Sequence, residues 1–591
     1  MTVVNFFEKN LQALEKHQPH VARWLKDQRI DRELRLITNR WRSPDWPLAS
    51  GKGLFEAIPP RVIYESWVPK EKAHLSATII VGCNLGYGLN HVLTRTPNAH
   101  KVFVVEPRAE MMAACLGQND YSQVFKINRL FFLPPDLGYL RKAVFQQLCL
   151  QHEFGDIFLR QDIPSQQIGP EYMFWAQRCT EVLTDLRVEM NTLRESQDTM
   201  VKNELDNFQR AMKDGSISYL KNKAEGLSAV ILAAGPSLNT HARLMLKHPA
   251  TALYASAFQL LPALQRYRLK PHLCMAIDFT DALRRVYDRL DKNWARSIPL
   301  VYSCKVTPGV VQAYPGPTLP VWTTGGLGTA IWRGKEPVLN SGRNVGIALI
   351  RFLNWCGVKR LFLVGFDFAW QGEFTHVKGH LASESRFHFD PKRHLKLKNK
   401  KGETVFSNPT FITALRTVEA ELKNIRAEVF NIYGGYATIA GAPEITWEEA
   451  VSSGLLNSDS DRLKHFSMKL SERQPSTPPL LEAKSSQWTE SLGFARKRLE
   501  KLFRRAKNNQ KEIKASLDQL LIFLTQDPLY HPYLVAEIRR LAGLIFTGNG
   551  YGAKDLSECN DIIQRALDKV REMDQKLEAR PTSLRGLKTA F

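Results

Sequence analysis

The sequence has no pair of cysteines spaced as CxxC, although eight cysteines are scattered along its 591 residues. Zinc ribbons and disulfide frameworks both depend on paired cysteines, so neither is indicated. No uncharged apolar run approaches the roughly 18 residues that a membrane-spanning helix needs. The first residues, MTVVNFFEKNLQALEKHQ, carry early charges and lack the apolar core of a signal peptide. These absences predict a cytoplasmic protein with reduced thiols and no membrane span.

Acidic residues are the minority, because 59 Asp and Glu accompany 81 Lys and Arg and leave a net charge of +22. Either solvated helix faces or an acidic partner explains such an excess. Much of it lies in RKRLEKLFRRAKNNQKEIK near the C-terminus and in PKRHLKLKNKKGE at 391–403. No recognisable nucleic-acid-binding module accompanies these segments, so we expect no nucleic-acid partner. Docking of an acidic protein and a solvated surface both remain open.

The length exceeds what one hydrophobic core usually supports and predicts two to four domains. In the first, residues 1–190, the apolar runs Ala77–Val81 and Val102–Val105 indicate parallel strands around a helix at Leu89–Thr94. Residues 171–222 contain almost no Gly or Pro and predict a long connecting pair of helices.

Short apolar runs alternate with helical segments through the second predicted domain, residues 191–450. They are AVILAA, ALYAS, LCMAID, LVYSC, LPVWTT and RLFLVG, followed by a hairpin-like stretch and a helix at 409–425. This alternation is typical of a parallel sheet covered on both faces. Residues 451–591 begin with linker composition and continue with apolar residues at helical spacing. The predicted fold class is therefore α/β, with two Rossmann-like domains of mostly parallel sheets followed by a C-terminal helical bundle.

The first glycine-rich turn is VGCNLGYG, with Gly82, Gly86 and Gly88 after one strand and Glu106 at the end of the next. Glycines permit close approach of a phosphate, and an acid in this place takes a ribose hydroxyl. The spacing departs from GxGxxG, a pattern that gives many false matches. A nucleotide or S-adenosylmethionine site is one interpretation, and a Rossmann-like domain that does not use its site is the other.

The second turn, in AVILAAGPSLNTHARL, places Gly235, Pro236, Ser237 and Leu238 at the carboxyl end of a strand, where ligands bind in open α/β sheets. Ser237 can either cap the next helix or donate a hydrogen bond from its hydroxyl to a ligand. The backbone N–H groups of the next helix suit a phosphate. The pattern alone leaves a capped turn and a phosphate site equally open.

Polar residues also follow later strands. Asp278 ends MAID, Asp367 follows LFLVG with His376 nine residues later, and NSGRN offers Ser341, Gly342 and Asn344 at the head of a helix. The carboxyl ends of parallel strands share one sheet edge. We therefore expect these groups to line a pocket for a nucleotide and a second substrate.

AAGPSL, SGRNVGIAL, LVGFDFAWQGEFTHVKG, TALRTVEAEL and VFNIYGGYATIAG occur in the order seen in the motility accessory factor family, which this chain resembles over about residues 75–447. Members of that family resemble flagellin glycosyltransferases. The GPSL turn and the Ser-Gly element are also similar to those of bacterial sialyltransferases that use CMP-activated sugars. The resemblance implies transfer of a nonulosonic acid, of pseudaminic or legionaminic type, from its CMP form to Ser or Thr of flagellin, as flagellum assembly and motility require.

The resemblance also implies roles for individual residues. Around the donor nucleotide it places Gly235–Leu238, Ser341, Gly342 and Asn344, and we add Ser256 near the cytidine. His376 is the expected catalytic base, Asp367 orients it or the acceptor, and Asp278 is the alternative for either role. Sialyltransferases commonly have Asn before the GPS turn, where this chain has Ala234, so one direct contact to the nucleotide is lost.

We expect no metal site and no cofactor beyond the donor substrate. The only DxD pattern, Asp459-Ser460-Asp461, lies in a polar stretch that predicts a solvated loop. Two alternatives remain open. Archaeal pterin pyrophosphokinases share the GPSL turn and the strand-end Asp but are shorter and use Mg²⁺ with ATP. A non-catalytic flagellin-binding assembly factor would keep the fold without the activity.

Overall fold

The computed structural model describes residues 5–30, 36–342, 344–384, 388–476, 479, 481–548, 550–578 and 580–581. The chain divides into two compact units. The first comprises Met1–Glu195, Leu502–Asp518 and Arg539–Leu556, and the second comprises Ser196–Lys501, Gln519–Ile538 and Ser557–Phe591. The predicted domain limits at 190 and 450 stay predictions.

The first unit is built on a four-stranded parallel sheet of order β5-β4-β3-β6. Its strands are β3 (Ala77–Val81), β4 (Lys101–Val105), β5 (Leu130–Leu133) and β6 (Ile157–Gln161). Its helices are α1 (Phe7–His17), α2 (Pro19–Asp27), α3 (Pro60–Tyr64), α4 (Tyr87–Arg95), α5 (Ala109–Gln118), α6 (Ser122–Lys126), α7 (Leu137–Gln147), α8 (Cys149–Phe154) and α9 (Ile163–Gln166). Helices on both faces bury the apolar runs, which is why β3 and β4 match the predicted strands.

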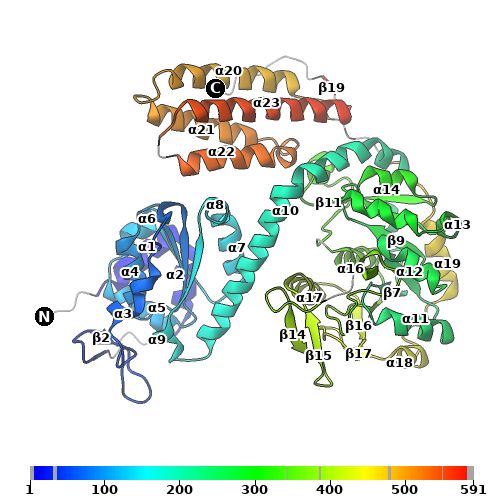
Figure 1. Cartoon of the computed structure of the whole chain (residues 1–591), viewed down its shortest axis with the longest axis horizontal. Helices are drawn as coiled ribbons and strands as arrows, with labels where there is room; N and C mark the ends of the chain where they lie inside the picture. Colours follow the sequence, from blue (N-terminus) through cyan, green and yellow to red (C-terminus); the bar gives the residue numbers. More distant parts are fainter. Residues whose placement is uncertain are drawn as a thin grey trace. The chain divides into compact units, whose positions relative to one another are not determined.

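Residues Glu171–Asp214 form a single helix of 44 residues, α10, which Figure 1 shows as one continuous coil. The prediction of a helix pair over 171–222 is therefore wrong. No Gly or Pro interrupts residues 171–214, so the segment lacks the two residue types that most strongly break a helix. The helix ends before Gly215, whose φ of +94° suits glycine.

The second unit contains a nine-stranded parallel sheet of order β12-β11-β10-β9-β8-β7-β13-β16-β17. Its strands are β7 (Ser228–Leu232), β8 (Leu253–Ala257), β9 (Leu273–Ala276), β10 (Leu300–Ser303), β11 (Thr318–Thr323), β12 (Val338–Leu339), β13 (Arg360–Val364), β16 (Glu428–Ile432) and β17 (Glu444–Ile445). All six predicted runs are strands, and every residue of β7 is buried.

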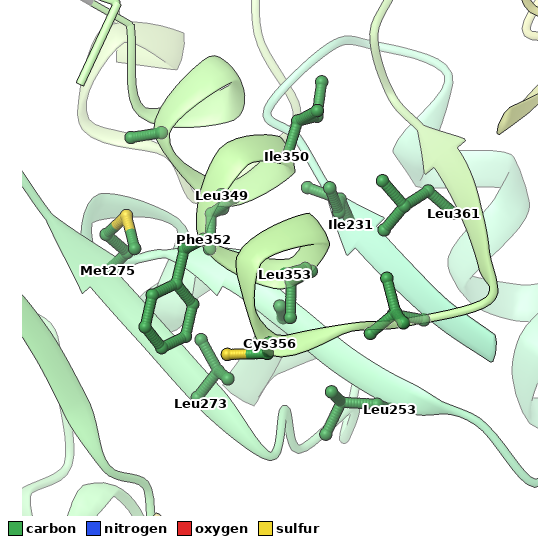
Figure 2. Packing of buried hydrophobic residues seen from close by; sticks show 14 of the residues in the cluster. Ile231, Leu253, Leu273, Met275, Leu349, Ile350, Phe352, Leu353, Cys356 and Leu361 are labelled. Atoms are coloured by element: carbon green, nitrogen blue, oxygen red, sulfur yellow. The ribbon is translucent and has the colours of Figure 1, made fainter. Parts of the chain in front are cut away.

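Helix α16 (Val345–Cys356) covers one face of this sheet. Figure 2 shows Leu349, Phe352 and Leu353 of this helix packed with Leu253 of β8 and Leu273 of β9. Each fully buried apolar side chain of this size contributes about 1.5–3 kcal/mol. This packing fixes the start of α16 at the carboxyl edge of the sheet.

The remaining helices surround the sheet or form the C-terminal region. Those of the sheet region are α11 (Leu238–Lys247), α12 (Leu261–Arg266), α13 (Lys292–Ala295), α14 (Pro308–Ala313), α15 (Gly328–Trp332), α17 (Pro409–Leu422), α18 (Trp447–Ser452) and α19 (Ser460–Lys469). The C-terminal region contains α20 (Ser485–Phe503), α21 (Gln510–Thr525), α22 (Val535–Thr547) and α23 (Ala553–Lys576) and is helical, as predicted. None of the described helices is long and apolar enough to cross a membrane.

Four further two-residue strands and one hairpin complete the chain: β1 (Ile37–Thr38), β2 (Pro44–Asp45), β18 (Glu482–Ala483), β19 (Arg580–Pro581) and the hairpin β14–β15 (Leu395–Lys398, Thr404–Ser407). The expectation of a solvated loop at Asp459-Ser460-Asp461 holds in part. All three residues are exposed and Asp459 lies in the connection before α19, but Ser460 and Asp461 belong to the helix. The Asp459 carboxylate caps this helix by accepting the Arg462 N–H at 2.9 Å.

Candidate active site

The sheet of the second unit reverses its strand order between β7 and β13. The strands β8 to β12 lie beyond β7 on one side, and β16 and β17 lie beyond β13 on the other. The loops that follow β7 and β13 therefore leave the same edge in diverging directions, which is where open α/β sheets bind ligands. The Gly235 turn follows β7, and Asp367 follows β13.

Ser237 and Asp367 join these two loops. The Ser237 backbone N–H donates to Asp367 Oδ2 at 2.8 Å, and its hydroxyl donates to Oδ1 at 2.7 Å. Both side chains are buried, so the bonds are shielded from water. Ser237 precedes α11 but makes no side-chain cap bond to it, contrary to the capping alternative. Its hydroxyl positions the carboxylate instead.

Glycine is required on both sides of this pair. A Cβ on Gly235 would lie within 3.0 Å of both Asp367 Oδ2 and the Gly365 carbonyl oxygen. A Cβ on Gly434, in the loop after β16, would lie equally close to the Ser237 side chain and to Asp367 Oδ1. The three loops approach so closely that only glycine fits.

The loop that carries His376 is fixed to the turn after β7. The Val377 N–H donates to the Ala234 carbonyl oxygen at 2.9 Å, and the Lys378 N–H donates to Asn239 Oδ1 at 3.4 Å. His376 immediately precedes Val377 and therefore lies beside the turn, where it is half-buried. Among the described residues no hydrogen bond joins Asp367 to His376, so direct orientation of the base by Asp367 is not present here.

Two neighbours orient His376 instead. Thr375 Oγ1 lies 2.8 Å from His376 Nδ1, and the His380 ring is stacked on the His376 ring with centroids 4.6 Å apart. The Phe411 ring meets His376 edge-on at 6.1 Å. Neither Thr375 nor His380 is among the residues predicted from the sequence, although the hydroxyl next to His376 and the spacing HVKGH signal them.

Burial shifts the pKa of the ionisable groups in this cluster. Loss of hydration raises the pKa of Asp367 to about 6, against the lowering effect of the two Ser237 hydrogen bonds. Loss of hydration lowers the pKa of His376, and burial together with the nearby His376 lowers that of His380 to about 3. Both imidazoles are therefore neutral at pH 7, the state in which a histidine accepts a proton.

Ser341 lines a small pocket at the same sheet edge, beyond β9 to β12. The pocket is lined by Met275, Ile277, Val301, Ser303, Val321, Thr323, Leu339, Asn340, Ser341 and Ala348. Gly342 adopts a φ of +63°, and Asn344 caps α16 through a 2.7 Å bond from the Gly346 N–H. Ser341, Gly342 and Asn344 thus lie at the head of a helix, as expected from the sequence.

The remaining predicted contacts are placed differently. Ser256 is fully buried in β8, and its hydroxyl has no hydrogen-bond partner among the residues that the structure describes. Asp278 follows β9, is half-buried and accepts the Thr280 N–H at 2.9 Å. Neither residue has a hydrogen bond to Asp367 or His376.

The backbone N–H groups of the second turn are also in use. Gly235 donates to Gly365, Ser237 to Asp367, and Leu238 to Gly235, while Pro236 has no N–H. The structure therefore does not leave these donors free for a phosphate in the way the sequence suggested. Residues Ala233–Pro236 are half-exposed and offer a ligand a surface of fixed shape rather than backbone donors.

Side chains of the first unit fill its glycine turn. A Cβ on Gly82 would lie 2.7 Å from Ser165, one on Gly86 2.5 Å from the Tyr121 hydroxyl, and one on Gly88 2.6 Å from Trp67. Residues 81–86 are buried. These glycines therefore make room for the protein's own side chains.

Glu106, the expected ribose ligand, is occupied as well. Its carboxylate accepts the Cys83 N–H at 2.8 Å, the Arg108 N–H at 3.0 Å and the Tyr172 hydroxyl at 2.8 Å. The side chain is fully buried, which raises its pKa to about 7. It acts in the core of the unit rather than at a surface.

Comparisons with known proteins agree with this architecture. Residues 202–373, less than a third of the chain, match a family model described as 6-hydroxymethylpterin diphosphokinase MptE-like. Among solved structures, the MAf glycosyltransferase from Magnetospirillum magneticum AMB-1 has a similar fold, with a TM-score of 0.60 and 15% sequence identity over 97% of this chain and 96% of that chain. No curated protein sequence matches. The predicted α/β fold class is confirmed, whereas activity has to be argued from the site.

Proposed function

We propose that this chain is a glycosyltransferase that moves a nonulosonic acid from its CMP-activated form to Ser or Thr of flagellin in the bacterial cytoplasm. The observation that carries the proposal is the junction of three segments at the sheet's switch point. The turn at Gly235, the carboxylate of Asp367 and the loop of His376 are far apart in sequence and hydrogen-bonded into one cluster. The fold shared with the MAf glycosyltransferase supports it.

The proposed reaction is a single displacement at the anomeric carbon. The acceptor oxygen forms a bond to the anomeric carbon while the bond between this carbon and the CMP phosphate oxygen breaks. CMP leaves with the electron pair of the broken bond. His376 takes the hydroxyl proton on Nε2, in the tautomer whose Nδ1–H donates to Thr375 Oγ1. Positioning of donor and acceptor supplies much of the rate because the leaving group is already an anion.

We assign the donor phosphate to Ser341, Gly342 and Asn344 rather than to the turn at Gly235–Leu238. The backbone donors of the turn at Gly235 are occupied, whereas Ser341 lies beside a small, mostly apolar pocket near the start of α16. The N-terminal end of a 12-residue helix favours an anion. In this scheme Asp367 and Ser237 hold the loops together and act as positioning residues.

Mass spectrometry of flagellin from a deletion strain tests the proposal. Loss of a repeated mass on Ser and Thr, restored by the wild-type gene, is the expected result and identifies the sugar. Calorimetric titration of the purified protein with CMP supplies the second test. Unmodified flagellin masses together with absent CMP binding would favour a non-catalytic assembly factor.

A pterin pyrophosphokinase is the second candidate, because the MptE-like model matches residues 202–373. The described residues contain no group of three or more His, Cys, Asp or Glu side chains placed to hold a metal ion. Titration with ATP and Mg²⁺ separates the candidates. Saturable binding of ATP with Mg²⁺, and none of CMP, would support the pyrophosphokinase.

A further inference from the structure

The hairpin β14–β15 carries the densest positive charge near the candidate site. Six exposed basic residues lie within positions 392–401: Lys392, Arg393, Lys396, Lys398, Lys400 and Lys401. Asp390 lies 3.6 Å from Arg393, and Glu444 is paired with Lys400. The other four lysines have no carboxylate within 4.0 Å in the described part of the chain. The hairpin therefore presents uncompensated positive charge to solvent.

One edge of this hairpin is open. The Asn399 N–H donates to the Glu403 carbonyl oxygen, and the register pairs Lys398 with Thr404 and Lys396 with Phe406. Hydrogen-bonded pairs alternate along an antiparallel ladder, so the backbone groups of Lys396 and Lys398 point away from β15. No described backbone group bonds to them. The outer edge of β15, in contrast, is covered, because Phe406 and Trp370 exchange two 2.8 Å bonds.

The hairpin is fastened to the loops of the candidate site. The Ser407 hydroxyl donates to the Phe368 carbonyl oxygen at 2.7 Å, and Asn399 Nδ2 donates to the Gly435 carbonyl oxygen at 2.9 Å. These carbonyls belong to the residues next to Asp367 and Gly434. Figure 1 shows the hairpin beside α17 and β16.

A row of rings connects the candidate base with the start of β14. Phe411 contacts both His376, at 6.1 Å, and Trp370, at 5.6 Å, and Trp370 contacts His394 at 5.9 Å. His394 immediately precedes Leu395, the first residue of β14. Three successive ring contacts thus link His376 to the residue that precedes β14.

We propose that the outer edge of β14 binds the acceptor polypeptide as an added extended strand of acidic character, and this inference rests on the proposed glycosyl transfer. The outward backbone N–H and C=O groups of Lys396 and Lys398 would form hydrogen bonds with the backbone of the added strand. The lysines pair with Asp or Glu of the acceptor, and Leu395 (44% exposed), the first residue of β14, offers an apolar contact. Lysines on an edge strand also prevent aggregation, but that role alone produces no binding.

Fluorescence anisotropy on the full-length protein tests the charge requirement, with a short labelled peptide of Glu, Thr and Val as the probe. The double variant Lys396→Glu, Lys398→Glu should weaken binding about tenfold or more, because attraction becomes repulsion at two positions. Lys497→Glu, Lys501→Glu on α20 makes the same change of charge at exposed positions and should leave binding within about twofold. Equal loss in both pairs would overturn the proposal.

A second pair of variants tests strand addition separately from charge. Lys396→Pro and Lys396→Ala both remove the charge, but only proline removes the outward N–H, and proline is tolerated on such an edge. The proline variant should bind severalfold more weakly than the alanine variant at an unchanged melting temperature. Equal binding would overturn strand addition.

The outcomes also separate this inference from the proposed function. If the wild type does not bind CMP, the proposed function is contradicted. If CMP binding is intact but peptide affinity is unchanged in every hairpin variant, only the proposed docking site is contradicted. A single-stranded oligonucleotide of matched length and charge that binds as tightly as the peptide would likewise overturn a polypeptide partner.

Discussion

The glycine turn after β3 and the glycine turn after β7 begin alike, since each follows the first strand of a parallel sheet and precedes a helix. They differ in what lies against the glycines. Aromatic side chains, Tyr121 and Trp67, fill the space at Gly86 and Gly88, whereas backbone and the Asp367 carboxylate lie against Gly235. Residues 81–86 are buried, but Ala233–Pro236 reach the surface. A glycine-rich turn therefore indicates close packing. Whether a ligand can bind there depends on which groups surround the turn and on whether the turn reaches the surface.

The largest expected effect concerns His376, whose loop is fixed to the turn after β7. His376→Ala should reduce transfer by about 10²–10⁴-fold, because the acceptor loses its base. CMP affinity should stay unchanged in calorimetry. His465→Ala, an exposed histidine on α19, is the matched control and should retain full activity. Transfer that survives in His376→Ala would assign the base to another group.

Adding one methyl group to each turn sharpens the comparison. Gly88→Ala and Gly235→Ala should each lower the free energy of unfolding by about 1–3 kcal/mol, because both side chains meet close neighbours. Specific transfer activity of the remaining folded protein should fall only in Gly235→Ala, which displaces Asp367. Gly493→Ala in α20, where nothing lies within 4 Å of the added Cβ, is the control. It should stabilise the protein by about 0.5–1 kcal/mol in urea unfolding.

The buried turn after β3, which contacts Glu106, also predicts that stability depends on pH. Burial raises the pKa of Glu106 from 4.5 to about 7, so the folded state holds a proton that the unfolded state has released. Stability contributed by this group is present below pH 4.5 and is lost as pH rises to about 7. Glu106→Gln should flatten this part of the profile by on the order of 1–3 kcal/mol. Urea unfolding at pH 5 and pH 8 measures it, and an unchanged slope would contradict burial as the cause.

Much of the fold follows from local pattern, because β7 and its neighbours are continuous apolar runs that a doubly covered sheet requires. The partners within the site do not follow from it. Ser237 bonds to a carboxylate 130 positions away, and no local signal in the sequence distinguishes that bond from a helix cap. The continuity of α10 was misjudged for a different reason, since composition shows that a helix is favoured but not where a turn interrupts it.

The smallest predicted effect concerns Ala234, where sialyltransferases commonly carry Asn. Its carbonyl oxygen holds the His376 loop through Val377, and its side chain is half-buried beside the turn. Ala234→Asn keeps the carbonyl and adds one polar group to the surface that would face the nucleotide. A single added hydrogen bond is worth about 0.5–1.5 kcal/mol, so CMP affinity should rise by about 2- to 12-fold in calorimetry. Ala234→Leu adds volume without a donor and should weaken CMP binding; unchanged CMP affinity in both variants would mean that the nucleotide lies elsewhere on the sheet edge.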